Sequence, residues 1–447
     1  MGRASHQRAL EVWANGEHVA TWRLPSRGPM ELVYSEQWLD SPHARPVSLS
    51  LPLGVKGSIL YGERVENFFR NLLPDSEAIR RRMASKFKVA KPEPFDLLEA
   101  VGRDCVGALQ LLPPGDEPVG FNQVLAQPLS EREVAEHLRR TVTSASLGSP
   151  QEEDDFRISI AGAQEKSALL WFEGQWCMPH GATPTTHIMK LPLGTVGQAV
   201  KVDMSTSVEN EWLCARILSA YGLDVAPSWM GTFEEQKVLI VERFDRRWAH
   251  DGSWILRLPQ EDFCQVKGLP PSMKYEVDGG PGFGAIAAQL HQSTQAEKDR
   301  NDLMTSQVLF WMLAAIDGHA KNFSIRLLPQ GRYRLTPFYD VVSALPVLGK
   351  GRNQWSRQKL TMAMAVEGAN RHYHWWQIQR RHFNHMAQKH GYSQGAKAQI
   401  QHLIEATPRV IEEVSQQLPA DFPPALADAI FSGLTASALM LTQMPAS

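Results

Sequence analysis

The hydrophobic pattern of this chain changes in kind along its length, and that change constrains the fold more than any other feature. Before about residue 283, short alternating apolar segments typical of strands are mixed with helical ones. After it the pattern is mainly helical, with a broad apolar face over 302–316. Because 447 residues are too many for one ordinary core, we predict several domains: an α/β (α+β) N-terminal part followed by a mainly helical C-terminal part.

Residues 1–145 are predicted to form a small α/β subdomain. Alternation from Leu10 to Leu24 is centred on Asn15-Gly16, a strong signal for a hairpin turn. We expect further elements in this order: a strand at 47–53, a helix over 66–89 and a strand at 104–112. The segment contains no constellation of catalytic residues, so we interpret it as structural or partner-binding.

The middle of the chain begins with a polar, acidic stretch at 146–155, which indicates a linker or an exposed loop. The elements expected after it are strands at 157–160, 167–172, 186–191 and 237–242 and a helix at 206–221, where Thr206 and Glu209 have capping-box spacing. This order of sheet, helix and sheet is typical of a nucleotide-binding lobe. We therefore predict such a lobe over 146–282 and a mainly helical lobe over 283–447.

Charge and cysteine usage exclude several other classes. The net charge of −2 argues against general binding to nucleic acid or to anionic membranes. Apolar runs are broken before bilayer length, and the N-terminus lacks a signal-peptide core, so we expect no membrane span and a cytoplasmic location. The four cysteines show no C-x-x-C pair and are expected to be reduced buried thiols: Cys105, Cys177, Cys214 and Cys264.

The most informative motif is DGHAKN, from Asp317 to Asn322. An Asp followed five residues later by Asn has the spacing of a kinase catalytic loop. Such an Asp accepts or orients the hydroxyl proton of the substrate, and such an Asn holds a magnesium ion at the phosphates. Taken alone, the motif is as typical of a turn after a helix as of a site.

Two further residues extend this hypothesis. Asp340 follows 18 residues after Asn322, where a kinase places its second magnesium ligand. Lys190 ends the THIMKL strand, where a kinase places the cation that holds the α- and β-phosphates. Glu209 or Glu211 on the next helix would pair with it. The alternatives are a solvated loop carboxylate, a strand-end lysine in solvent and exposed helix glutamates.

The loop SIAGAQEK, from Ser159 to Lys166, lies between two expected strands and is a candidate cover for the phosphates. It lacks G-x-G-x-x-G, so a plain hairpin loop is the competing interpretation. Glu242-Arg243-Phe244 ends a buried strand, where the backbone of a kinase binds the adenine, and a simple sheet terminus is the alternative there.

Taken together, these segments resemble the HipA family, the serine/threonine kinase toxins of bacterial HipBA toxin–antitoxin modules. The resemblance runs over nearly the whole chain and implies a two-lobed, protein-kinase-like architecture. Its blocks are SIAGAQEK (159–166), HIMK (187–190), VERFD (241–245), LPQED (258–262), DGHAKNFS (317–324) and YDV (339–341).

The resemblance implies the following roles. Asp317 is the catalytic base, and Asn322 and Asp340 hold Mg²⁺. Ser159 is the serine that becomes autophosphorylated, and a phosphate there would expel the loop and silence the enzyme. The residues implied to bind ATP are Ala161, Gly162, Ala163, Gln164, Glu165, Lys166, Lys190, Glu242, Arg243, Phe244, His319, Ala320, Lys321, Asn322, Tyr339 and Asp340.

The resemblance also implies partners. These are a HipB-type helix-turn-helix antitoxin, operator DNA reached through the antitoxin complex, and glutamyl-tRNA synthetase as the protein substrate, whose inhibition arrests growth. Two other functions remain open from the residues: a small-molecule kinase of the aminoglycoside or choline type, and a catalytically inactive co-repressor. The complete set of Lys190, Asp317, Asn322 and Asp340 argues against the inactive protein.

Overall fold

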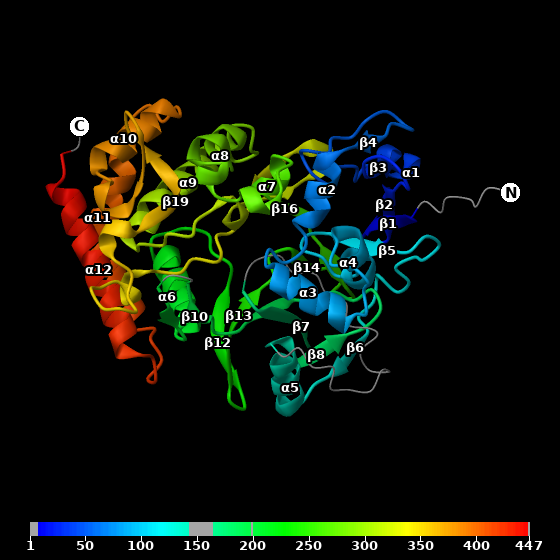
Figure 1. Cartoon of the computed structure of the whole chain (residues 1–447), viewed down its shortest axis with the longest axis horizontal. Coiled ribbons are helices and arrows are strands. Elements are labelled where there is room, and N and C mark those ends of the chain that lie inside the picture. The colour runs from blue at the N-terminus through cyan, green and yellow to red at the C-terminus, as the bar shows by residue number, and fades with distance from the viewer. Residues whose placement is uncertain (1–7, 143–163, 198–199, 446–447) are drawn as a thin grey trace.

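The computed structural model describes residues 8–142, 164–197 and 200–445. The N-terminal sheet and the last three helices lie at opposite ends of the long axis, and the other sheets lie between them (Figure 1). The predicted linker at 146–155 and the predicted strand at 157–160 lie outside the described residues.

The N-terminal segment forms a five-stranded antiparallel sheet in the order β4-β3-β2-β1-β5. Its strands are β1 (Arg8–Ala14), β2 (Glu17–Leu24), β3 (Glu31–Tyr34), β4 (Leu60–Tyr61) and β5 (Leu109–Leu112), with the short helix α1 (Glu36–Asp40) after β3. The predicted hairpin is confirmed, because Asn15 and Gly16 both have positive φ, 49° and 83°, as a type I′ turn requires. Trp22 stacks on Phe69 at 3.8 Å in the core beneath this sheet.

Two expectations for this segment are wrong in detail. Residues 47–53 form only a bridge between Ser48 and Leu51, because the Tyr34 hydroxyl accepts from Val47 N and donates to Leu51 O. The single helix expected over 66–89 is divided into α2 (Glu63–Arg70) and α3 (Glu77–Lys86), with Pro74 in the break. A third helix, α4 (Pro94–Val101), completes the layer.

The middle of the chain forms a six-stranded antiparallel sheet in the order β12-β13-β9-β7-β8-β6. Its strands are β6 (Ala126–Pro128), β7 (Lys166–Phe172), β8 (Gln175–Pro179), β9 (His187–Lys190), β12 (Ser228–Phe233) and β13 (Gln236–Glu242). The helices α5 (Glu131–Val142) and α6 (Ser207–Ala220) accompany it, so the predicted helix and the three predicted strands in the described part are confirmed. The predicted capping box is not formed, since Thr206 makes no side-chain cap hydrogen bond.

Short strand pairs and one three-stranded sheet lie outside the two main sheets. They are β10 (Gly194–Val196) with β11 (Val202–Met204), β14 (Arg246–Trp248) with β15 (Ile255–Arg257), and β16 (Gln260–Asp262), β17 (Ser324–Leu327) and β18 (Tyr333–Leu335) in one sheet. The helix α7 (Phe263–Val266) follows β16.

The C-terminal part is mainly helical, as predicted. Its helices are α8 (Phe283–Leu290), α9 (Ala296–Met312), α10 (Arg380–Lys389), α11 (Lys397–Ser415) and α12 (Pro424–Gln443). The expectation that the chain is helical throughout 355–440 is wrong at its start, where β19 (Thr361–Glu367) and β20 (Arg371–His374) form a hairpin. The main apolar core includes residues of α6, α9, α11 and α12, so α6 joins the middle sheet to the helical lobe.

The fold class predicted from the sequence is confirmed: a mixed α/β part is followed by a mainly helical end. Among the described helices, α12 is long and apolar enough to cross a bilayer by length and composition. In this fold, its residues Ile430, Leu434 and Leu441 are buried in the main core, where α12 packs against α11 and α9.

Candidate active site

A cavity of about 730 Å³ lies where the middle sheet meets the helical lobe. Most of the site residues predicted from the sequence line it: Gln164, Lys166, Lys190, Glu242, Arg243, Phe244, Asp317, His319, Lys321, Asn322, Tyr339 and Asp340. Glu165 and Ala320 are adjacent to it in the chain but do not line it. Ser159, Ala161, Gly162 and Ala163 lie outside the described residues.

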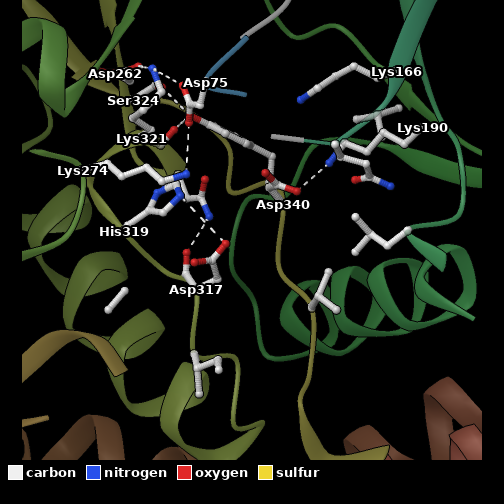
Figure 2. Close-up of a pocket in the computed structure, with 18 of the residues that line it drawn as sticks. Asp75, Lys166, Lys190, Asp262, Lys274, Asp317, His319, Lys321, Ser324 and Asp340 are labelled. Carbon is white, nitrogen blue, oxygen red and sulfur yellow. Dashed lines mark hydrogen bonds and ion pairs between the residues drawn. The ribbon is translucent and has the colours of Figure 1, made fainter. Parts of the chain in front are cut away.

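Lys190 closes the cavity from the sheet side (Figure 2). It is the last residue of β9, and its Nζ lies 2.6 Å from Glu211 Oε1 and 2.9 Å from Asp340 Oδ1. Burial alone would lower the pKa of Lys190, but the two carboxylates outweigh it and hold the pKa above its ordinary value. Lys190 is therefore a fixed, permanently charged cation at the cavity wall.

The sequence left two glutamates as partners for this lysine, and the structure distinguishes them. Glu211 faces inward from α6 and binds Lys190, whereas Glu209 binds Lys237 with its Oε1 2.5 Å from Nζ. Both glutamates are buried, so exposure does not distinguish them. They differ in the face of α6 from which each side chain projects.

Lys166 is the second cation on this side, and its side chain points into the cavity from the start of β7 (Figure 2). In contrast to the Lys190 ammonium, the Lys166 ammonium makes no hydrogen bond or ion pair with any described residue. Burial lowers its pKa to about 8, with Asp340 opposing that effect and Lys190 adding to it. An anion entering the cavity would give this ammonium a partner that the described residues do not supply.

Asp340 lies at the centre of the cavity, and its backbone is in the left-handed region with φ of 61°. Few residues other than glycine adopt this conformation, and such residues concentrate at functional sites. Burial would raise the pKa of Asp340, but Lys190 and Lys166 hold it well below its usual range. The carboxylate is therefore ionised, and only its Oδ1 is bonded to Lys190.

The loop from Asp317 to Asn322 is closed by its own hydrogen bonds. The Asn322 side-chain amide donates to Asp317 O at 2.8 Å, and the backbone N–H of His319 donates to the same oxygen at 2.7 Å. A Cβ on Gly318 would lie 2.6 Å from the Phe310 ring, so the close approach of α9 requires glycine there. The loop is thereby fixed in front of the end of α9, with the Asp317 side chain 63% exposed to the cavity and solvent.

Lys321 points away from the open part of the cavity. Its Nζ lies 2.7 Å from Asn71 Oδ1 and 2.9 Å from Asp262 Oδ2, with Asp75 Oδ1 at 3.7 Å. Asp75 also pairs with Lys274 at 3.1 Å (Figure 2). The predicted contact of Lys321 with ATP stays a prediction, but its ammonium already has buried partners.

Asn71 and Asp75 are site residues that the sequence did not indicate. Both lie between α2 and α3 in the N-terminal segment, and both line the cavity. The interpretation of residues 1–145 as purely structural or partner-binding is therefore incomplete. No local sequence signal could have identified these two, because their partners are about 200 and 250 residues away in the chain.

The segment predicted to bind adenine contributes mainly its backbone and one ring. Arg243 N–H donates to Thr186 O, and the Arg243 guanidinium faces away into a buried network with Asp104 and Asp245. The Phe244 ring lies 5.7 Å from the Tyr339 ring. Arg243 thus anchors the strand end, and the aromatic pair is left to form a wall of the cavity.

The donor atoms present suit a magnesium ion that is also bound by phosphates. No described residue donates a hydrogen bond to Asn322 Oδ1 or to Asp340 Oδ2, so two hard oxygens remain for a cation. The described residues contain no cluster of three or more His, Cys, Asp or Glu able to hold a metal by themselves. A site with few protein ligands is the usual arrangement for Mg²⁺ in a phosphoryl-transfer enzyme.

The sheet lobe, the helical lobe and the charged cavity between them define the chain as a two-lobed, kinase-like protein. Comparison with known proteins identifies the family. Residues 158–416 match the HipA-like C-terminal domain and residues 10–112 match the HipA N-terminal domain. The chain belongs to the HipA family of kinases, as the sequence predicted.

Individual relatives agree with this assignment. Y4mE of Sinorhizobium fredii is 34% identical over 343 residues, which are 76% of this chain and 78% of the relative. The serine/threonine-protein kinase toxin HipA of Shewanella oneidensis is 28% identical over 328 residues, 69% of each chain. A solved structure of Shewanella oneidensis HipA, in a complex with HipB and its operator DNA, has a TM-score of 0.77 at 22% identity and covers 97% of both chains.

Proposed function

We propose that this chain is a serine/threonine protein kinase that uses ATP and Mg²⁺ to phosphorylate a serine of a protein target. The observation that carries the proposal is the convergence of Lys190, Asp317, Asn322 and Asp340 on one cavity. These residues come from both lobes and are separated by up to 150 positions in the chain. They are the residue types that phosphoryl transfer requires, since its catalysis is mainly positioning and charge stabilisation.

Each residue would have a distinct task. Lys190 and Lys166 supply positive charge for the phosphates, with Gln164 at the same edge of the cavity. Asn322 and Asp340 would hold Mg²⁺, which would neutralise charge on the transferring phosphoryl group. Asp317 is exposed enough to meet an incoming hydroxyl, and it would accept or orient the proton of that hydroxyl.

The remaining ATP contacts in this proposal belong to three segments of the chain. Residues 161–166 would cover the phosphates, Glu242 to Phe244 would bind the adenine, and Tyr339 with residues 319–322 would complete the site. We further propose that Ser159 is autophosphorylated and that its phosphate silences the enzyme. The domain boundaries proposed with this function are 1–145, 146–282 and 283–447.

We also propose a biological context from the family. The chain would act in the cytoplasm as the toxin of a type II toxin–antitoxin module, inhibited by a HipB-type antitoxin and contributing to growth arrest, persistence and operon autoregulation. Its target would be glutamyl-tRNA synthetase. Support comes from the relative named as a kinase toxin and from the related HipA that was solved with HipB and operator DNA.

The proposal is tested by transfer of labelled phosphate from [γ-³²P]ATP to purified glutamyl-tRNA synthetase, with aminoglycoside and choline as competing acceptors. We expect Asp317→Asn to reduce transfer by roughly 10²–10⁴-fold, the usual contribution of a positioned base. Asp251→Asn is the matched control, because among the described residues that carboxylate bonds to Ser253 in an exposed turn. Full transfer by Asp317→Asn, or label only on a small molecule, would contradict the proposal.

A further inference from the structure

Tyr275 makes a contact with the proposed base that neither the sequence nor the family assignment indicates. Its hydroxyl donates a hydrogen bond to Asp317 Oδ1 at 2.7 Å. Among the described residues, this hydroxyl is the one side-chain donor within hydrogen-bond distance of that carboxylate. The nearest other candidate, His319 Nε2, lies 3.9 Å from Asp317 Oδ2.

An exposed aspartate has little to fix its orientation, and Asp317 is more than half exposed. The 317–322 loop holds the backbone oxygen of Asp317 but does not restrain the carboxylate. A carboxylate that rotates freely would present the acceptor hydroxyl with a poorly aligned oxygen, and misalignment at the reacting atoms is costly in rate. The Tyr275 hydroxyl restrains Oδ1 and leaves Oδ2 open toward the cavity.

Tyr275 itself is held firmly. Its ring packs edge-on against His319 with ring centroids 5.2 Å apart, and Lys274 Nζ lies 5.4 Å from the centre of the ring. Ala320 N–H donates to Lys274 O at 3.1 Å, which joins the segment directly to the 317–322 loop.

The backbone turn that follows Tyr275 is also fixed by hydrogen bonds. The backbone N–H groups of Asp278 and Gly280 both donate to Tyr275 O. A Cβ on Gly280 would lie 2.8 Å from that oxygen and 2.0 Å from Met273 O, so this turn can be built only with glycine. Glu276 extends the anchorage by accepting from Ala365 N on β19 at 2.7 Å.

We infer that Tyr275 is a positioning residue, which orients the Asp317 carboxylate for the acceptor hydroxyl through this hydrogen bond. The inference rests on the proposed function, because it assigns Tyr275 a task in the same reaction. Burial and the charge of Asp317 both raise the pKa of Tyr275, so the phenol remains a donor throughout the physiological range.

The test is Tyr275→Phe, which removes the hydroxyl and keeps the ring against His319. We expect kcat to fall by about 10-fold or more, the usual effect of losing one charge-assisted hydrogen bond, with KM for ATP unchanged within about 2-fold. The loss should therefore fall on kcat and not on KM. A purely structural role would lower the amount of folded protein or raise KM, and would not produce this split between kcat and KM.

The matched control is Tyr392→Phe, whose hydroxyl donates to Arg300 O at 2.7 Å inside the helical lobe. It removes the same atom from a buried tyrosine and should leave both kcat and KM unchanged. Site-specific 3-fluorotyrosine at position 275 is a second variant that keeps the hydroxyl and the packing. Because its phenol still donates to Asp317, kcat should stay within about 2-fold of the wild-type value.

The outcomes separate this inference from the proposed function. If Asp317→Asn abolishes transfer but Tyr275→Phe leaves kcat unchanged, only the role of Tyr275 is overturned. A rise in kcat for Tyr275→Phe would also overturn it, since the hydroxyl would then be competing with the acceptor. If the wild-type chain transfers no phosphate, or Asp317→Asn transfers it at the full rate, the proposed function fails first and Tyr275 has no base to position.

Discussion

The ion pair between Lys190 and Glu211 allows a quantitative prediction for Glu211→Gln. Both side chains are more than 90% buried, and the Nζ–Oε1 distance is 2.6 Å. At an effective dielectric constant of about 20, that separation corresponds to an attraction of about 6 kcal/mol. The cost of removing both charges from water cancels part of it, and burial does raise the pKa of Glu211.

Two features reduce the loss of stability expected for Glu211→Gln. Lys190 keeps Asp340 as a partner at 2.9 Å, and glutamine still offers an amide oxygen to the ammonium. Complete removal of one partner from a buried pair typically costs about 3–5 kcal/mol. We therefore expect Glu211→Gln to lower the free energy of unfolding by about 2–3 kcal/mol. Transfer of phosphate should also fall, because Lys190 would move toward Asp340 and away from the phosphates.

The assay is urea unfolding followed by tryptophan fluorescence, with Glu209→Gln as the control. Glu209 lies two residues earlier on α6 and pairs with Lys237, whose side chain is 45% exposed. Solvent screens that pair, so its loss should change the free energy of unfolding by about 1 kcal/mol or less. An equal or larger effect of Glu209→Gln, or no effect of Glu211→Gln, would refute the electrostatic reasoning.

Two pH-dependent predictions concern other buried groups. Burial lowers the pKa of Lys166 to about 8, and bound phosphates should raise this pKa. ATP binding should therefore take up about three-quarters of a proton near pH 8.5 and almost none near pH 6.5. Calorimetry in buffers of different ionisation enthalpy measures this uptake, and its persistence in Lys166→Gln would contradict the assignment. Glu261 accepts from Ser48 Oγ and from Leu49 N–H at 2.8 Å, and burial raises its pKa to about 8. The folded state therefore keeps a proton that the unfolded state releases between about pH 4.5 and 8, so stability should fall as pH rises through that window, by roughly 3–5 kcal/mol from this group. Urea unfolding at pH 5 and pH 8 should show a smaller difference for Glu261→Gln than for wild type, and an identical difference would refute the prediction.

Much of the site was predictable because its functional residues lie in short segments with recognisable patterns. The strand that ends at Lys190 and the helix that ends before Asp317 have clear hydrophobic periods, so their ends could be located from the sequence. The spacing of Asp317, Asn322 and Asp340 then indicated a phosphoryl-transfer site. The turn at Asn15-Gly16 was predictable for a similar reason, since it depends on the φ preferences of two adjacent residues.

Other features depended on contacts that no local pattern encodes. The helix expected over 66–89 is interrupted between α2 and α3, and this break carries Asn71 and Asp75 to the cavity. The backbone of 47–53 pairs with the Tyr34 hydroxyl instead of with a neighbouring strand, although its alternation is typical of a strand.

The sequence by itself determined the hairpin at Asn15-Gly16, the fold class, the family and the main residues of the proposed catalytic set. Only the tertiary structure decided that Glu211 rather than Glu209 binds Lys190, that Asp75 supports Lys274 and that Tyr275 contacts Asp317. The physical reason is the range of the interactions. Periodicity and turn preferences act over a few residues, whereas these pairs join segments 21 to about 200 residues apart, which meet only when the lobes and the N-terminal sheet pack together.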